Sequence, residues 1–132
     1  MSETEHTNLP DFRDARRPSK VYSGTCVDGV FLVTVLDSAL PRSEENPRVL
    51  APDVSRALKD CSRAFCWARE GEGSVQLALA LLLDVTGEAE TALAWHESFT
   101  EKYVMNLKAE WTVPEIDIAL WLYCFENSRP GS

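Results

Sequence analysis

Residues 74–87 read SVQLALALLLDVTG. On a helix, these residues would cover almost the whole circumference with apolar side chains, and such a helix is stable only where most of its surface is buried. Gly87 follows the last apolar turn, where helices commonly end on a residue that tolerates positive φ. We therefore expect this helix at the centre of the core, with Asp84 as its one ionisable side chain.

The length and the N-terminal sequence bound the class of protein. A chain of 132 residues forms one domain that needs no metal or disulfide to complete its core. Residues 1–6 lack the basic and apolar regions of a secretory signal. The apolar runs Leu77–Leu83 and Ile118–Phe125 are too short to cross a bilayer. We expect a soluble, cytoplasmic protein that does not bind membranes.

The cysteines and histidines do not suggest a metal centre. Cys26, Cys61, Cys66 and Cys124 are scattered and form no Cys-x-x-Cys pair, and the histidines are His6 and His96. Zinc sites need closely spaced ligand pairs, so we expect reduced structural thiols, no metal and no cofactor. A catalytic cysteine paired with His96 stays an alternative that requires the fold to bring the two together.

The negative charge is concentrated in one half of the chain. The formal net charge is −8, yet residues 1–69 carry equal numbers of acidic and basic side chains, so residues 70–132 hold the entire excess. An acidic surface repels nucleic acid and attracts basic proteins, including those that bind nucleic acid. The alternative is a surface that serves solubility alone.

The pattern along the chain predicts an α+β fold in a single domain, residues 20–128. Residues 1–19 are expected to form a flexible arm and residues 129–132 a disordered tail. Lys20–Gly24 and Val30–Asp37 are predicted strands, joined by a turn at Asp28-Gly29. The second strand is apolar on both faces, so we expect helices to cover one of them. Ala64–Trp67 is a candidate third strand. The small antiparallel sheet, of two or three strands, would pack against three main C-terminal helices.

A second helix is predicted from about Glu88 to Leu107. Its apolar arc contains His96, which we expect to be a hydrogen-bonded core residue. Glu90, Glu97 and Glu101 form a stripe on the polar side. Trp95 lies at the edge of the apolar arc, as half-buried packing or as an interface anchor. We take Glu90, Glu97, Glu101 and Trp95 as candidate residues for binding a protein partner.

The third helix is predicted to begin with Thr112 as N-cap and to reach about Glu126, with Pro114 in the first turn and Glu115 completing a capping box. Both of its faces are apolar. We expect one face, with Ile116, Leu120, Tyr123 and Cys124, to point at the core. The other face carries Ile118, Trp121, Leu122 and Phe125, and we expect it to mediate self-association as a homodimer.

Several motifs resemble a small bacterial and phage family, domain of unknown function 6166. The shared features are Phe65 and Trp67, the turn with Gly71 and Gly73, the helix Gln76–Leu82 closed by Asp84 to Gly87, and Trp111-Thr112. Tyr22, Gly24 and the strand Val30–Val35 fit the family's N-terminal part. The resemblance implies an accessory protein of phages and mobile elements. It supplies no catalytic residue to carry over.

These observations favour a small acidic binding protein over an enzyme. It would occupy a basic surface of a macromolecule, without contacting nucleic acid directly; a phage-encoded inhibitor of host defence, such as an anti-CRISPR protein, is the concrete form. A homo-oligomeric structural or regulatory module is the alternative. An enzyme would need Asp84, His96, Gln76 and a cysteine to converge, although most of them occupy core-facing positions.

Overall fold

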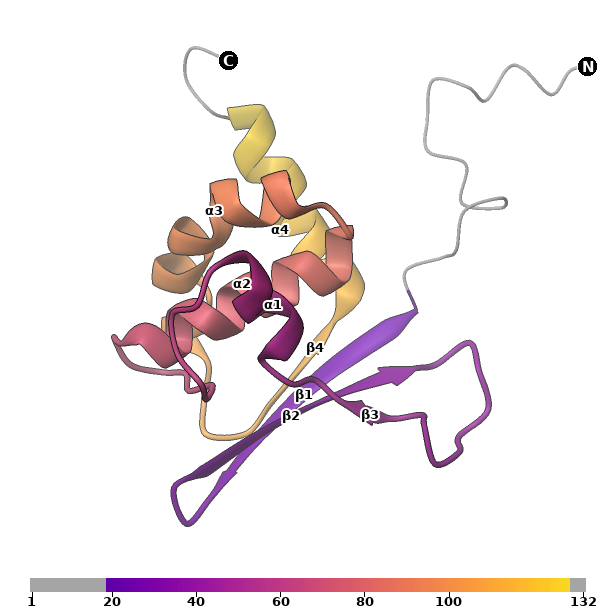
Figure 1. The fold of residues 1–132 in the computed structure, drawn as a ribbon. Helices are drawn as coiled ribbons and strands as arrows, with labels where there is room; N and C mark the ends of the chain where they lie inside the picture. Colours follow the sequence, from indigo (N-terminus) through magenta and orange to yellow (C-terminus); the bar gives the residue numbers. More distant parts are fainter. Residues whose placement is uncertain (1–18, 129–132) are drawn as a thin grey trace, which may run out of the picture.

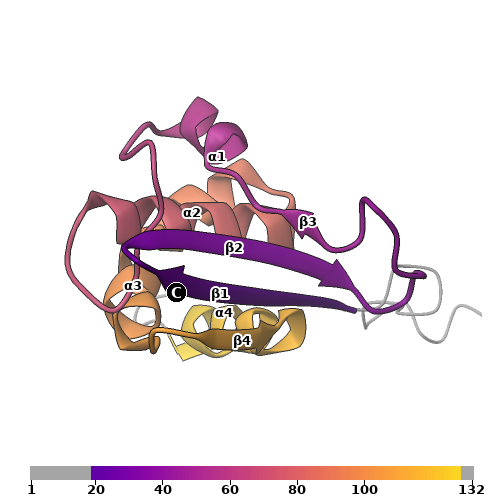
Figure 2. The same ribbon diagram turned by 90° about the horizontal axis from the view of Figure 1, so that it is seen from below.

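The computed structural model of the protein describes residues 19–128. The order of elements is β1 (Lys20–Val27), β2 (Val30–Asp37), β3 (Arg48–Val49), α1 (Asp53–Leu58), α2 (Glu72–Thr86), α3 (Ala89–Lys102), the 3-10 helix η2 (Val104–Asn106), β4 (Trp111–Pro114) and α4 (Glu115–Ser128). The strands form one antiparallel sheet in the order β3-β2-β1-β4, and the helices lie on one of its faces (Figures 1 and 2). The α+β class is confirmed, with four strands in this sheet instead of two or three. The expected arm up to residue 18 and the expected tail lie outside the described residues.

The β1–β2 hairpin has the predicted turn. Asp28 and Gly29 have φ angles of 53° and 79°, and Val27 pairs with Val30 on either side of them. Two consecutive residues with positive φ make a turn whose twist matches that of the flanking strands. β1 continues to Val27, three residues beyond the expected end, because the tight turn lets pairing run to its edge.

Ala64–Trp67 is not a strand, and this prediction was wrong. Phe65 and Trp67 are buried, but the segment is irregular and anchors a loop on the core. The Trp67 ring lies edge-on to Phe31 at 4.7 Å and to Trp111 at 5.4 Å between ring centroids. Alternating burial at positions 65 and 67 therefore reflects two apolar anchors, although it imitates the two-residue period of a strand.

The third and fourth strands come from other segments. β3 pairs with β2, and β4 pairs with β1, where Val113 lies opposite Tyr22. Thr112 is thus a strand residue and not a helix N-cap, and α4 begins at Glu115. Trp111 and Val113 are buried while Thr112 and Pro114 are exposed, which is strand periodicity. β4 is an edge strand, where a proline without an N–H group is tolerated.

The predicted central helix is confirmed. Eight residues of α2, from Ser74 to Leu82, are buried. Gly87 has a φ of 68° and its N–H donates to the carbonyl of Leu83 at 2.7 Å, so it ends the helix as expected. Neither this helix nor any other helix within residues 19–128 is both long enough and apolar enough to cross a membrane.

α3 ends earlier than predicted. It stops at Lys102, and the 3-10 helix η2 follows in place of a continuous helix to Leu107. Tyr103 leaves helical geometry, with φ −127° and ψ −59°, while its ring stacks on Phe99 at 4.8 Å. The apolar pattern continues past residue 102 because η2 is also packed on the core, where Val104 is fully buried.

The two faces of α4 are the reverse of the prediction. Ile118 and Leu122 are buried, and Trp121 packs against the core. The face expected inside is exposed, with Ile116, Leu120 and Tyr123 showing 39%, 52% and 65% of their surface and Cys124 also exposed. Because both faces are apolar, helical periodicity could not choose between them. Pairing of β4 with β1 sets the rotation of the helix that follows it.

Candidate functional site

Glu90, Glu97 and Glu101 define an acidic face on α3. All three side chains are exposed. At about 100° per residue, they fall within about 40° of one another around the helix. The buried residues of α3, among them His96 and Phe99, lie on the opposite side. The predicted stripe therefore exists as one solvent-facing row of carboxylates.

A single basic side chain approaches this row within the described residues. Lys59, which follows α1, places its Nζ atom 3.8 Å from Glu97 Oε2, and the two side chains are 48% and 76% exposed. A pair of this kind contributes little because water screens it and long side chains lose freedom on pairing. The acidic face keeps most of its negative potential.

The loop before α2 adds a fourth carboxylate that sequence analysis missed. Glu70, Glu97 and Glu101 line a shallow hollow of about 270 Å³ together with Val75 and Met105. The hollow has an apolar wall and an acidic rim, a combination that suits the aliphatic stem and cationic end of lysine or arginine. Only the path of the loop brings Glu70 to α3, so helical spacing could not have identified it.

Trp95 does not belong to the acidic face. It lies at least about 120° around α3 from each of the three glutamates. Its ring is half-buried and meets the Trp121 ring edge-on, with 6.3 Å between centroids. The structure therefore separates Trp95 from the other candidate partner-binding residues and assigns it to packing between α3 and α4.

The residues expected to mediate self-association lie mainly inside the molecule. Ile118 and Leu122 are buried, so they cannot contact a second copy. Trp121 lies between Phe99, at 4.9 Å, and Phe125, at 4.2 Å. The contact with Phe99 joins α4 to α3, whereas the contact with Phe125 lies within α4. The expected exposure of Ile118 and Leu122 was wrong because α4 is rotated the other way. Trp121 and Phe125 are partly exposed and line a hollow on α4, so self-association through these two residues stays a prediction.

The polar groups considered for catalysis are engaged in structural bonds. Gln76 is fully buried on α2, and its carbonyl oxygen accepts the N–H groups of Cys61 and Ser62 at 2.7 and 2.9 Å. Its amide donates to Ser55 Oγ and to the carbonyl of Lys59. Gln76 thus ties the irregular segment after α1 to the central helix.

His96 is the hydrogen-bonded core residue that we expected. It is 3% exposed; Nδ1 donates to the carbonyl of Leu93 at 2.8 Å, and Nε2 lies 3.5 Å from Lys59 Nζ. Both ring nitrogens are therefore occupied without a thiol. Burial raises the pKa of the Cys61 thiol, which makes it a poorer nucleophile at neutral pH.

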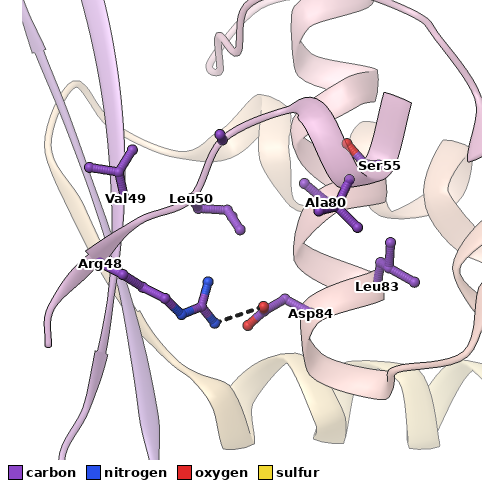
Figure 3. A pocket seen from close by; sticks show the side chains of 9 residues that line it. Arg48, Val49, Leu50, Ser55, Ala80, Leu83 and Asp84 are labelled. Atoms are coloured by element: carbon purple, nitrogen blue, oxygen red, sulfur yellow. Dashed lines mark hydrogen bonds and ion pairs between the residues drawn. The ribbon is translucent and has the colours of Figure 1, made fainter. Parts of the chain in front are cut away.

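Asp84 is the centre of a polar cluster that joins three elements. Its carboxylate accepts from Lys20 Nζ at 2.9 Å and from the Tyr22 hydroxyl at 2.6 Å, both on β1. Arg48 on β3 donates to it at 2.9 Å. Figure 3 shows the Arg48 and Asp84 side chains pointing toward each other. The sequence pattern singles out Asp84 but none of these partners, because they come from distant segments of the chain.

The electrostatics of this cluster favour a structural role. Burial alone would raise the pKa of Asp84, but the bonds from Tyr22, Lys20 and Arg48 outweigh it and hold the pKa below its ordinary value. Burial, reinforced by the bond to Asp84, raises the pKa of Tyr22 far above its usual range. At neutral pH the carboxylate stays ionised and the phenol stays protonated. Neither is poised to exchange a proton with a substrate.

A hollow of about 330 Å³ opens beside Asp84. Arg48, Leu50 and Leu83 are among the residues that line it, and Figure 3 shows it between the β3 segment and α2. Its charged groups are Arg48 and Asp84, which already pair with each other. Within residues 19–128, no cluster of three or more histidine, cysteine or carboxylate side chains could hold a metal ion.

The family assignment follows from a comparison of the whole chain. The model of a family of unknown function, DUF6166, matches residues 22–123. The chain belongs to this family. The DUF6166 match extends from Tyr22 in β1 to Tyr123 in α4 and includes the acidic face. No curated protein and no solved structure matches the chain.

The motifs that resembled DUF6166 have structural roles in this chain. At Gly24, a Cβ atom would lie 2.3 Å from the Trp111 ring, so only glycine lets Trp111 pack there. At Gly73, a Cβ atom would lie 2.8 Å from Cys66 Sγ, where the loop crosses the start of α2. Thr86 accepts the N–H of Glu88 at 3.1 Å and so helps the chain leave α2 for α3. These DUF6166 positions explain the fold and assign no reaction.

Proposed function

We propose that this protein is a cytoplasmic, non-enzymatic binding protein whose acidic face occupies a basic surface of a protein partner. The observation that carries the proposal is the exposure of Glu90, Glu97 and Glu101 in one row on the side of α3 that faces away from the core. The helix rises about 1.5 Å per residue, so the row extends about 16 Å. A row of carboxylates on a rigid rod presents regularly spaced negative charge to a partner, as phosphates do along a duplex.

The hollow beside the row suggests how the partner is held. A lysine or arginine of the partner would lay its aliphatic stem on Val75 and Met105, which line the hollow. Its charged end would meet the carboxylates of Glu70, Glu97 and Glu101, and charge-assisted hydrogen bonds of that kind are the stronger ones. The nearby Lys59 would have to release Glu97 or turn aside. The partner's basic surface would not be nucleic acid, which the acidic face repels.

The non-enzymatic part of the proposal is supported by the state of the candidate catalytic groups. Asp84 has three donors, Gln76 has four bonds, and both nitrogens of His96 have neighbours. Groups held in this way are positioned by the fold, and most of their hydrogen-bonding capacity is already used. In a concrete form of the proposal, a phage-encoded protein would block the nucleic-acid-binding surface of a host defence complex, as an anti-CRISPR protein does.

The test is affinity capture from an extract of the cells in which the protein is naturally expressed, using three purified versions as bait. The face variant carries Glu90→Lys, Glu97→Lys and Glu101→Lys. The control carries Glu44→Lys, Glu45→Lys and Glu110→Lys, which change the net charge equally at exposed positions elsewhere. We expect a protein that the parent and the control retain and the face variant loses.

The captured protein is then titrated in purified form at low and high salt. At physiological ionic strength, salt screens the interaction between exposed charges over about 8–10 Å. The affinity should therefore fall steeply as the salt concentration rises. If the face variant binds the same protein as tightly as the parent at low salt, the acidic face serves solubility alone and the proposal fails. If none of the three baits retains a binding partner, the alternative of a homo-oligomeric module is favoured.

A further inference from the structure

The sheet has an open face that carries no charge. Because the helices cover only one side, the outward residues of the strands face solvent among the described residues (Figure 2). On β1 and β2 they form cross-strand pairs, such as Thr25 with Leu32 and Val27 with Val30. β3 adds Val49 and β4 adds Thr112. Every outward strand residue is valine, leucine, threonine, serine or proline.

This face is less polar than is usual for a surface in contact with water, because its polar side chains are all serine or threonine. A sheet covered on one side only should show polar residues on the other, in alternation with the buried ones. Here Val27, Val30 and Leu32 are 61%, 66% and 45% exposed, and Val49 is 60% exposed. Charged residues make up 26% of the chain, yet none of them points outward from a strand. Large exposed apolar patches on a small protein mark interaction surfaces.

We propose that two copies of this chain pack against each other through this open sheet face. The distribution of charge on the molecule favours a second copy as the partner of this face. Each copy carries a net charge of −8, so two copies repel overall, and contact through a surface without charged side chains adds no close like-charge pairs to that repulsion. A basic partner, by contrast, would find no carboxylate on this face. The exposed side of α4 is a poorer choice for a second copy because Asp117 lies within it, beside Leu120.

The shape of the surface also suits a second copy. Two sheets pack face to face at about 10 Å, and a two-fold axis brings the same patch of each copy together. Each strand residue covers about 3.3 by 4.8 Å of the sheet plane, which gives this sheet a footprint of roughly 350 Å² per copy. Two such footprints bury about 700 Å² in total, less than a stable interface needs, so we expect a weak, transient dimer that dissociates at micromolar concentrations.

The proposal does not depend on the proposed function. Face-to-face pairing leaves both helical layers on the outside, so each acidic face stays accessible in the dimer. A dimer would carry two such faces. The dimer can be tested without knowing the protein partner of the acidic face. If no dimer forms, the proposed role of the acidic face is unaffected.

The test is the molar mass of the full chain by sedimentation velocity from about 5 to 500 µM, the range a weak dimer requires. The expected mass rises with concentration from 14.8 kDa towards twice that value. Leu32→Lys, and separately Val30→Lys, should keep the mass at 14.8 kDa because each places a charge on the face. Two separate variants are used so that the misfolding of one of them does not decide the result. The control is Leu120→Lys on the exposed side of α4, which should dimerise as the parent does.

Three results would overturn the proposal. The parent could stay at 14.8 kDa throughout the range. Folded Leu32→Lys and Val30→Lys proteins, judged by circular dichroism and melting, could dimerise like the parent. Leu120→Lys could abolish the dimer, which would place the interface on α4.

Discussion

The Tyr22 hydroxyl donates a 2.6 Å hydrogen bond to the carboxylate of Asp84, sixty-two positions further along the chain. Tyr22 is fully buried in β1, and Asp84 lies in the last turn of α2. The bond therefore fixes the end of the central helix over the sheet. Lys20 and Arg48 complete the cluster from β1 and β3, so one carboxylate holds the helix to two strands.

Replacing Asp84 should destabilise the protein by removing the centre of this cluster. In Asp84→Asn, Lys20 loses its counter-ion although only 12% of its side chain is exposed. We expect a loss of about 2–3 kcal/mol, less than for a fully buried pair because Arg48 is partly exposed and water screens it. Urea unfolding followed by tryptophan fluorescence measures the change. The control is Asp60→Asn, whose exposed pair with Arg56 should matter little; equal effects from the two would contradict a structural role for the cluster.

Tyr22 should make the folded protein sensitive to alkali. The pKa of Tyr22 is raised by burial and by its bond to Asp84, whereas in the unfolded chain it is about 10. The stability linked to Tyr22 is therefore complete below pH about 10 and is lost as the pH rises above that value. Tyr103, whose pKa is also raised, acts in the same direction. Tyr22→Phe should lower the slope of the unfolding free energy between pH 10 and 11.5, and an unchanged slope would argue against this assignment.

Asp84 should make the free energy of unfolding depend on pH in the acidic range. Its pKa is lowered in the folded state, so its contribution is complete above the unfolded value of about 3.9 and is lost as the pH falls below it. Asp84→Asn should flatten the stability profile between pH 4 and 2. Tyr22→Phe retains the bonds from Lys20 and Arg48 to Asp84 and should keep most of this acid limb.

Gly24 should not accept a larger side chain. A Cβ atom there would lie 2.3 Å from the Trp111 ring, which is buried against Trp67. We expect Gly24→Ala to cost about 2–3 kcal/mol through overpacking, with a shift in tryptophan emission as Trp111 moves. Adding Trp111→Leu should make the glycine substitution nearly neutral, which a double-mutant cycle would show as strong coupling. Additive effects of the two substitutions would mean that the ring does not make this contact.

Leu79 tests the central position of α2. Its side chain is fully buried, so Leu79→Ala should lower the free energy of unfolding by about 2–5 kcal/mol. Leu120→Ala is the matched control, because Leu120 is 52% exposed on α4 and should lose far less. Chemical denaturation gives both values, and a small effect at Leu79 would show that the core can collapse around the gap.

The acidic face was predictable as far as it depends on one helix. Glu90, Glu97 and Glu101 share a side of α3 by helical spacing alone, and their exposure follows from the buried residues opposite. Glu70 was not predictable, because a loop carries it to the hollow. The partners of Asp84 were not predictable either, since Lys20, Tyr22 and Arg48 approach it only after the sheet and α2 have packed.

The sequence by itself determined the elements whose pattern is local: the hairpin around Asp28-Gly29, the buried helix ended by Gly87, and the α+β class. Tertiary structure alone decided which face of α4 is buried, that Trp111–Pro114 is a strand, and that Phe65 and Trp67 anchor a loop. In each of these cases the segment is apolar enough for more than one arrangement. Local propensity then gives no preference, and the choice rests with contacts between residues far apart in the chain, such as the pairing of Val113 with Tyr22.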